Sequence, residues 1–172
     1  MAQGRNQFVG AAGQYFLAYG LAARQVNAGI TLGNAPSVDV LASSSDGSRS
    51  LAFQVKTSRN AYRRNRYGCE GFEWDVGANV IGKHSEGFWY AFIDLGEQNI
   101  RSWSPKIFFV PSKWVAEFVK PGWSRYSYFL PKSVEHLTSE RWDLVSGYLA
   151  SDREAIEWAK SWPETMLVKW GA

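Results

Sequence analysis

The sequence predicts a single α/β domain, built on a mixed β-sheet of four to five strands flanked by helices. A long stretch with helical spacing near the N-terminus precedes several short β-like runs, as this fold class requires. The chain has 172 residues and 45% hydrophobic content, which suits one well-covered core. We therefore assign residues 1–172 to one domain, with an aromatic-rich C-terminal half over residues 72–172.

The first predicted element is a helix over residues 7–27, which lack proline and carry apolar side chains at helical spacing. Gly29 is expected to end it. Short β-like runs follow at residues 30–32, 38–42 and 51–56. The serine-rich residues 43–48 separate the last two runs and predict the turn of a hairpin.

The second half predicts further strands and short helices. Residues 59–71 are basic and contain two glycines, which favours a loop. Apolar runs at residues 88–95 and 107–110 predict strands. Ser112 is a candidate N-cap for a helix over residues 113–119, and Ser139 or Asp152 are candidate caps for later helices.

Composition sets broad limits on function. Lys and Arg total 19 against 16 Asp and Glu, so the net charge of +3 permits an anionic partner without requiring one. The single cysteine, Cys69, excludes an intrachain disulfide, and the polar start lacks the apolar run of a secretory signal. No stretch approaches the roughly 18 apolar residues of a membrane span. We expect a cytoplasmic protein without a membrane partner.

Three polar residues are predicted to converge, and a fourth lies on the preceding helix. Period-two alternation places Gln54 and Lys56 on the strand face opposite Phe53 and its apolar neighbours. Asp39 alternates with the valines beside it, so it can join Gln54 and Lys56 while the apolar faces share one core. Gln14 is a polar residue on a helix face of small and apolar side chains.

This grouping suits phosphodiester hydrolysis, which needs a hard cation with oxygen ligands to activate water and to neutralise charge developing on the phosphate. Asp39 would supply the anionic metal ligand and Gln54 a weaker carbonyl ligand. Lys56 would stabilise the developing oxyanion or help to deprotonate the attacking water.

These residues carry a resemblance to a known family. Residues 13–15 read Gly-Gln-Tyr, residues 36–39 read Pro-Ser-Val-Asp, and residues 53–57 read Phe-Gln-Val-Lys-Thr. In this order they resemble the PD-(D/E)XK nuclease superfamily, in particular the branch with a Q-x-K third motif. That branch includes Mrr-like restriction endonucleases and relatives of Holliday-junction resolvases. The resemblance covers roughly residues 8–58.

The resemblance implies a restriction-endonuclease-like core that cleaves DNA in restriction, repair or mobile-element biology. It implies Mg²⁺, with Mn²⁺ as an alternative, bound by Asp39 and Gln54. Lys56 would assist catalysis, and Gln14 would complete the catalytic set at the position of the helix residue, where a glutamate is usual.

The match departs from the family pattern because Gln14 and Gln54 stand where many relatives have acids. Asp39 is then the only carboxylate of the motifs, and two neutral ligands hold a divalent cation weakly. The site would need a high metal concentration, borrow an acid, or be inactive. The acids considered for this role are Glu70, Glu73 and Asp75.

A cluster of four arginines directly follows the candidate site and predicts phosphate contacts that position a DNA duplex without reading its sequence. These arginines are Arg59, Arg63, Arg64 and Arg66. An ordinary solvated loop explains them about equally well. The assembly state stays open, with a homodimer among the options.

Two other site types are excluded. Residues 77–84 miss a phosphate-binding P-loop only at His84, which cannot replace the metal-binding hydroxyl. The segment also leaves no room for the helix that must follow. The two histidines, His84 and His136, are far apart and accompany a lone cysteine, so neither a zinc signature nor a cysteine–histidine nucleophile can be argued.

Two alternatives to an active nuclease remain. One is a catalytically inactive relative that binds nucleic acid. The other is a protein-interaction module that reuses the fold, with the aromatic second half as its contact surface.

Overall fold

The computed structural model describes residues 2–32, 37–96, 104–121 and 126–161, and its centre is a mixed five-stranded sheet. The strands of this central sheet follow the order β1 (Asn27–Ile30), β2 (Val40–Ser43), β3 (Ser50–Ser58), β6 (Phe88–Asp94) and β7 (Lys106–Pro111). β3 and β6 are parallel, and the other neighbours are antiparallel. The predicted α/β class with a mixed sheet of four to five strands is confirmed.

A second, antiparallel sheet was not predicted. Its strands follow the order β4 (Tyr62–Arg66), β5 (Cys69–Asp75), β9 (Tyr126–Pro131) and β8 (Lys120–Pro121). The hairpin of β4 and β5, with the short 3₁₀ helix η1 (Ala78–Val80), lies in the connection between β3 and β6. This connection is long enough to return the chain for parallel pairing.

The prediction of a loop over residues 59–71 is therefore wrong. Tyr67 and Gly68 have positive φ values of 53° and 81° and form the turn between β4 and β5. The ring of Tyr62 packs edge-on against Phe72, with centroids 5.6 Å apart. The arginines of β4 conceal its strand character, because only cross-strand packing against β5 favours a strand there.

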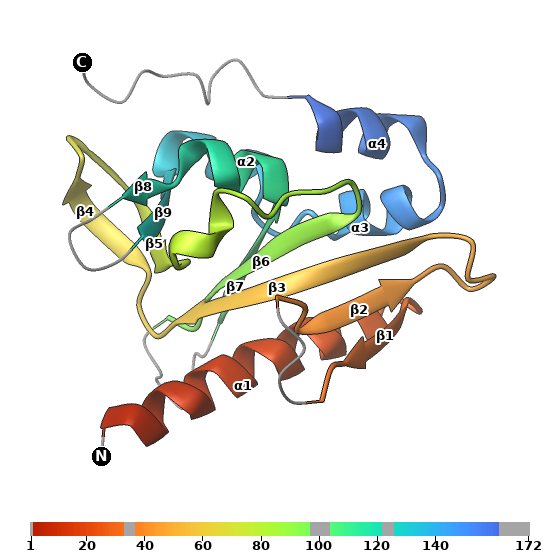
Figure 1. Cartoon of the computed structure of the whole chain (residues 1–172), viewed down its shortest axis with the longest axis horizontal. Helices are drawn as coiled ribbons and strands as arrows, with labels where there is room; N and C mark the ends of the chain where they lie inside the picture. The colour runs from red at the N-terminus through yellow and green to blue at the C-terminus, as the bar shows by residue number, and fades with distance from the viewer. Residues whose placement is uncertain (1, 33–36, 97–103, 122–125, 162–172) are drawn as a thin grey trace.

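Alternation along the central strands divides the interior into two cores. In β6, Trp89 and Ala91 belong to one core, whereas Tyr90 and Phe92 belong to the other. The first core is shared with α1 (Ala2–Ala22), α3 (Trp142–Leu149) and α4 (Arg153–Lys160). The second is shared with the second sheet and α2 (Ser112–Phe118). Figure 1 shows α1 along one side of the central sheet and α2 on the other.

The first helix ends earlier than predicted. α1 ends at Ala22, and residues 27–30 form β1 rather than the end of the helix. Gln25 adopts a positive φ of 61°, and the Val26 N–H donates to the Leu21 carbonyl over 3.1 Å. This is a Schellman-type termination, with glutamine where glycine is usual. The expected stop at Gly29 is therefore wrong.

Only one of the three predicted helix caps is confirmed. The Asp152 carboxylate accepts from the Ala155 N–H over 2.9 Å and caps α4. Ser112 is the first residue of α2 and makes no cap, because its hydroxyl bonds to Ser85 instead. Ser139 precedes α3 by three residues, and Arg141 stands at the N-cap. The structure also contains a second 3₁₀ helix, η2 (Lys132–Leu137).

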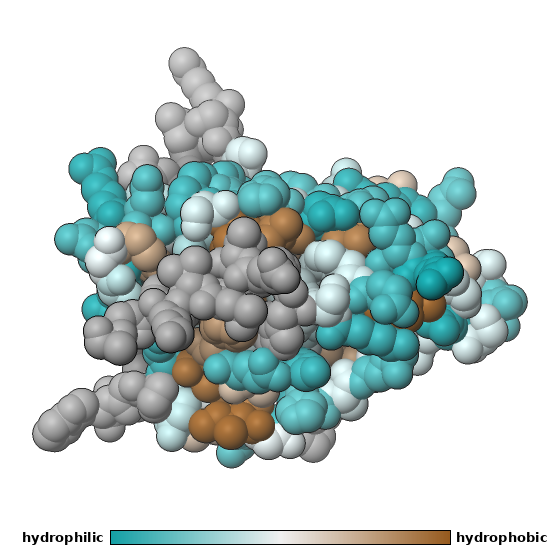
Figure 2. Space-filling model, turned by 90° about the horizontal axis from the view of Figure 1, so that it is seen from above, coloured by the Kyte–Doolittle hydropathy of each residue, from teal (hydrophilic) through white to brown (hydrophobic). Residues whose placement is uncertain are grey.

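The aromatic side chains that the structure describes in the second half lie mostly inside the protein. Among the described residues from 72 onward, Ile81 is the only exposed large hydrophobic side chain. Figure 2 shows one face on which hydrophilic side chains cover most of the described surface. The described aromatic residues of the second half are therefore mainly core residues.

None of the helices that the structure describes combines the length and the apolar character needed to cross a bilayer.

Candidate functional site

The candidate site is built where α1 meets β3. Gly13 allows this close approach, since a Cβ atom at this position would lie 1.9 Å from the Thr57 hydroxyl oxygen. Any larger residue would push the helix away from the strand. Gln14, the next residue, is thereby held beside the start of β2.

Asp39 joins three elements at this point. Its Oδ1 accepts a hydrogen bond from Gln14 Nε2 over 3.0 Å, and its Oδ2 accepts one from the Val55 N–H over 2.7 Å. The Asp39 N–H donates to the Phe53 carbonyl over 2.8 Å. β2 begins only at Val40, so the carboxylate supplies the partner for a β3 amide beyond the end of the regular ladder.

The predicted strand faces are confirmed on β3. Leu51, Phe53 and Val55 pack in or against the first core. Gln54 and Lys56 therefore share the opposite face. Among the described residues, the Gln54 side chain makes no hydrogen bond, and none joins it to Asp39.

Lys56 is a partly buried lysine whose pKa differs from its ordinary value. Burial lowers the pKa of Lys56, and the negative charges of Asp39 and Asp75 oppose this by favouring its protonated form. Lys56 lines a cleft of about 190 Å³ together with residues of β4 and β5. A lysine of this kind is suited to contact an anion or to exchange a proton.

The three acids considered as additional metal ligands have different surroundings in the structure. Asp75 lines the Lys56 cleft and acts on Lys56 by its charge. Glu73 is buried with 5% exposure and is paired with two arginines. Glu70 accepts a short hydrogen bond from the Tyr62 hydroxyl. Asp75 is therefore the acid placed to act with Lys56, and the sequence did not distinguish it because β5 was not predicted.

The four arginines fall into two classes. Arg63 and Arg66 pair with the buried Glu73 carboxylate, at 3.3 Å and 3.2 Å. Arg59 and Arg64 are exposed and belong to no ion pair among the described residues. Two of the predicted DNA-binding arginines thus have an internal partner, although their side chains are 38% and 45% exposed.

Of the predicted catalytic set, the structure joins Gln14 directly to Asp39 and places Lys56 within the electrostatic reach of Asp39. Gln54 shares the Lys56 face, and no hydrogen bond among the described residues joins it to the Asp39 carboxylate. Pro36, the first residue of the second motif, lies outside the described residues.

The residues of the site fit a divalent cation that needs few protein ligands. Mg²⁺ is commonly held by one or two carboxylates, with water and substrate phosphates completing its shell. Asp39 meets that minimum, and the Gln54 carbonyl oxygen is not engaged by any described residue. No group of three or more histidine, cysteine, aspartate or glutamate side chains suited to a metal occurs in the described part of the chain.

Comparisons of the chain with protein-family models, with curated proteins and with solved structures found no match. The geometry of the site is therefore the basis for any functional proposal.

Proposed function

We propose that the chain is a metal-dependent nuclease that hydrolyses DNA phosphodiester bonds and is related to the PD-(D/E)XK superfamily. One observation carries this proposal. Lys56 is partly withdrawn from solvent and lies under the influence of Asp39, a carboxylate anchored to both α1 and β3. A phosphodiester nuclease needs such a pairing of a metal-binding acid with a cation.

Each residue has a defined role in this proposal. A bound Mg²⁺ would activate water and neutralise charge on the phosphate. Asp39 supplies the charged metal ligand and Gln54 a neutral one. Lys56 stabilises the oxyanion that develops on the phosphate, and Gln14 orients the Asp39 carboxylate through the 3.0 Å hydrogen bond.

Asp75 acts on the protonation of Lys56 rather than on the metal. Its charge favours the protonated form of Lys56, and so does that of Asp39. A protonated lysine stabilises an oxyanion better than a neutral one, because the attraction is between full charges. Asp75 thus maintains the catalytic charge of Lys56 from the second sheet.

A second candidate is a non-catalytic protein that binds nucleic acid. The observation that favours it is the use of both Asp39 oxygens, which accept hydrogen bonds from Gln14 and Val55. A carboxylate so engaged also serves as a structural connection between α1 and β3. Metal binding then decides between the two candidates.

The deciding experiment titrates Mg²⁺ and Mn²⁺ into the protein by calorimetry and measures plasmid cleavage with the same preparation. We expect cleavage that rises with metal into the millimolar range. Asp39→Asn is the matched control, since it removes the charge while keeping the shape. Absence of both metal binding and cleavage in the wild-type protein would overturn the nuclease proposal and leave the non-catalytic candidate.

A further inference from the structure

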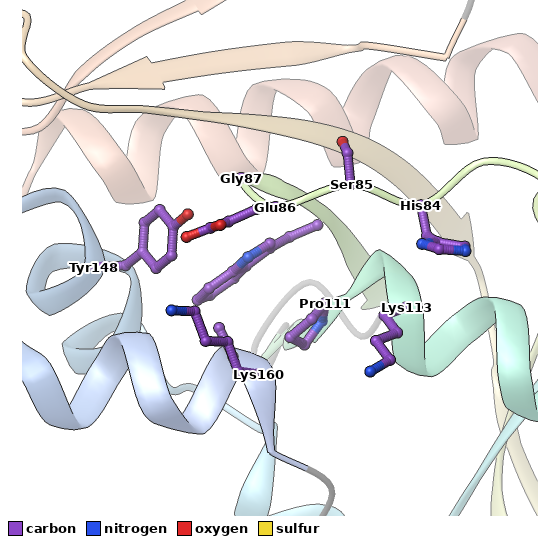
Figure 3. Close-up of a pocket in the computed structure, with 10 residues that line it drawn as sticks. His84, Ser85, Glu86, Gly87, Pro111, Lys113, Tyr148 and Lys160 are labelled. Carbon is purple, nitrogen blue, oxygen red and sulfur yellow. The ribbon is translucent and has the colours of Figure 1, made fainter.

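Two hollows meet at residues 84–87, the segment that leads into β6. The first, which we call the Lys113 hollow, has a volume of about 170 Å³. Beyond the shared segment, its lining residues are Trp89, Pro111, Lys113, Tyr148, Ala159 and Lys160. Figure 3 shows this hollow between α2, α3 and the end of α4.

The second hollow, which we call the Lys83 hollow, is more open and has a volume of about 400 Å³. Ser37 and Val38 line it, and they directly precede Asp39. Ala52 also lines it, two residues before Gln54 on the same face of β3. The Lys83 hollow therefore adjoins the candidate catalytic site, and the Lys113 hollow continues it in the direction away from Lys56.

The lysines of these two hollows can bind an anion, because no described carboxylate is paired with them. Among the described residues, no carboxylate forms an ion pair with Lys83, Lys113 or Lys160. Within the described part of the chain, the Lys83 ammonium group donates only to the neutral Ser37 hydroxyl, over 2.6 Å. This contrasts with Arg63 and Arg66, whose charges face the buried Glu73.

Among the described residues that line the hollows, Glu86 is the one acid, and its carboxylate is directed toward Tyr148. Figure 3 shows the Glu86 carboxylate pointing toward the Tyr148 hydroxyl. Burial raises the pKa of Tyr148, and the charge of Glu86 and a hydrogen bond from the hydroxyl raise it further. Glu86 therefore leaves the three lysines as the dominant charges of the two hollows.

The shared segment is held in place on both sides. The Ser112 hydroxyl bonds to the N–H and the carbonyl of Ser85, at 3.2 Å and 3.3 Å. Gly87 has a positive φ of 75°, and a Cβ atom there would lie 3.3 Å from the Ser50 carbonyl oxygen. A glycine is therefore required for the segment to lie this close to β3.

We propose that Lys83, Lys113 and Lys160 bind the phosphate backbone of the DNA substrate, and that they do so in place of the paired arginines of β4. This proposal rests on the proposed function for the identity of its substrate. The distance along β3 from Ala52 to Lys56 is roughly 13 Å, at about 3.3 Å per residue. Bases in one DNA strand rise by about 3.4 Å per step. A DNA strand whose scissile phosphate lies at the Lys56 cleft thus has phosphates a few nucleotides away at the Lys83 hollow.

The test measures binding of a fluorescein-labelled DNA duplex by anisotropy over a series of salt concentrations, with EDTA present. EDTA removes divalent metal, so binding is measured without cleavage. The variants are Lys83→Gln/Lys113→Gln and Arg63→Gln/Arg66→Gln, and Arg153→Gln is the control for loss of an exposed charge outside the hollows. Thermal unfolding checks that each variant is folded.

Each phosphate contact contributes about 0.9 to the slope of log binding constant against log salt concentration. We expect the lysine variant to reduce that slope by about 2, and the other two variants to leave it unchanged. An unchanged slope in the lysine variant would overturn the assignment, and a reduced slope in the arginine variant would then point to Arg63 and Arg66 instead. A wild-type protein that does not bind the duplex would also overturn the assignment.

Failure of this proposal is distinguishable from failure of the proposed function. If the protein cleaves plasmid DNA but the lysine substitutions leave the salt slope unchanged, only the assignment of the lysines as phosphate contacts is refuted. If the lysine substitutions reduce the salt slope but the protein cleaves no DNA at any metal concentration, the lysine contacts are supported and the nuclease proposal is refuted.

Discussion

Gln14 Nε2 lies 3.0 Å from Asp39 Oδ1, so a helix residue and a strand residue 25 positions apart share one hydrogen bond. The other oxygen of Asp39 accepts from the Val55 N–H over 2.7 Å. The carboxylate thus connects α1, the start of β2 and β3. Its structural role and its proposed metal-binding role can be separated by substitution.

Asp39→Asn and Asp39→Ala should both abolish cleavage but differ in stability. The asparagine oxygen can still accept from Val55, and the Gln14 amide can turn to accept from the asparagine amide. Alanine leaves the Val55 N–H without this partner, at a cost of about 1–3 kcal/mol. Thermal unfolding beside a plasmid cleavage assay measures both effects. Cleavage by Asp39→Asn at the wild-type rate would refute the metal-ligand assignment.

Gln14→Glu should make stability depend on metal. The hydrogen bond of 3.0 Å would be replaced by two facing carboxylates, which repel each other unless one is protonated or a cation lies between them. We expect a lower Tm in EDTA and a rise in Tm on adding Mg²⁺ that exceeds the rise in the wild-type protein. Gln54→Glu, at the other proposed ligand, should also raise the Mg²⁺ response but without the lower Tm in EDTA, because Gln54 has no hydrogen bond to Asp39 to lose. Equal Mg²⁺ responses in Gln14→Glu and wild type would argue against a cation at Asp39.

Lys56→Ala should lower turnover by a factor of roughly 100 or more with little change in DNA affinity. This is the expected result for a group that acts mainly on the transition state. Single-turnover cleavage with Mg²⁺ gives the rate, and anisotropy in EDTA gives the affinity. Equal losses in both would instead identify Lys56 as a simple phosphate contact.

Lys56 should also make stability depend on pH. Burial lowers the pKa of Lys56 in the folded protein below its ordinary value of 10.5, so the unfolded chain binds more protons between those two values. Burying the charged lysine lowers the free energy of unfolding. This loss is complete at pH values below the pKa of Lys56 in the folded protein, and it decreases as the pH rises toward 10.5. Lys56→Met should therefore be more stable than wild type at pH 7, and the difference in unfolding free energy should shrink in alkaline solution. A difference independent of pH would contradict this explanation.

The Glu73 cluster should contribute to stability rather than to DNA binding. Glu73 is only 5% exposed, so removing both Arg63 and Arg66 would leave its buried carboxylate without these two cationic partners. We expect Arg63→Ala/Arg66→Ala to cost about 1–2 kcal/mol, less than the ~3–5 kcal/mol for a fully buried pair, since both guanidinium groups are partly exposed. Glu73→Gln in the same background should restore much of the loss. Arg64→Ala is the control with no such partner, and a comparable loss there would contradict this role for the cluster.

The sequence by itself determined the central strands and their faces. Alternation between buried and exposed positions is a local property of an extended chain, so residues 51–56 could be divided into a core face and a face bearing Gln54 and Lys56. The strands at 88–94 and 106–111 were recognisable for a related reason, since continuous apolar runs mark strands buried on both faces. The same local patterns missed β4 and β5, whose charged residues find their partners only across a hairpin.

Only the tertiary structure decided how the site is assembled. Helix spacing placed Gln14 on a small apolar face but did not show that its amide meets Asp39. Neither did local pattern show that Asp75 would act on Lys56, or that Glu73 would occupy Arg63 and Arg66. The first pairing depends on how α1 packs on β3, the second on how the second sheet packs against the central one, and the third on the β4–β5 hairpin. Each arrangement results from burial summed over many contacts between residues distant in sequence. Local periodicity specifies the direction of a side chain, whereas long-range packing specifies its partner.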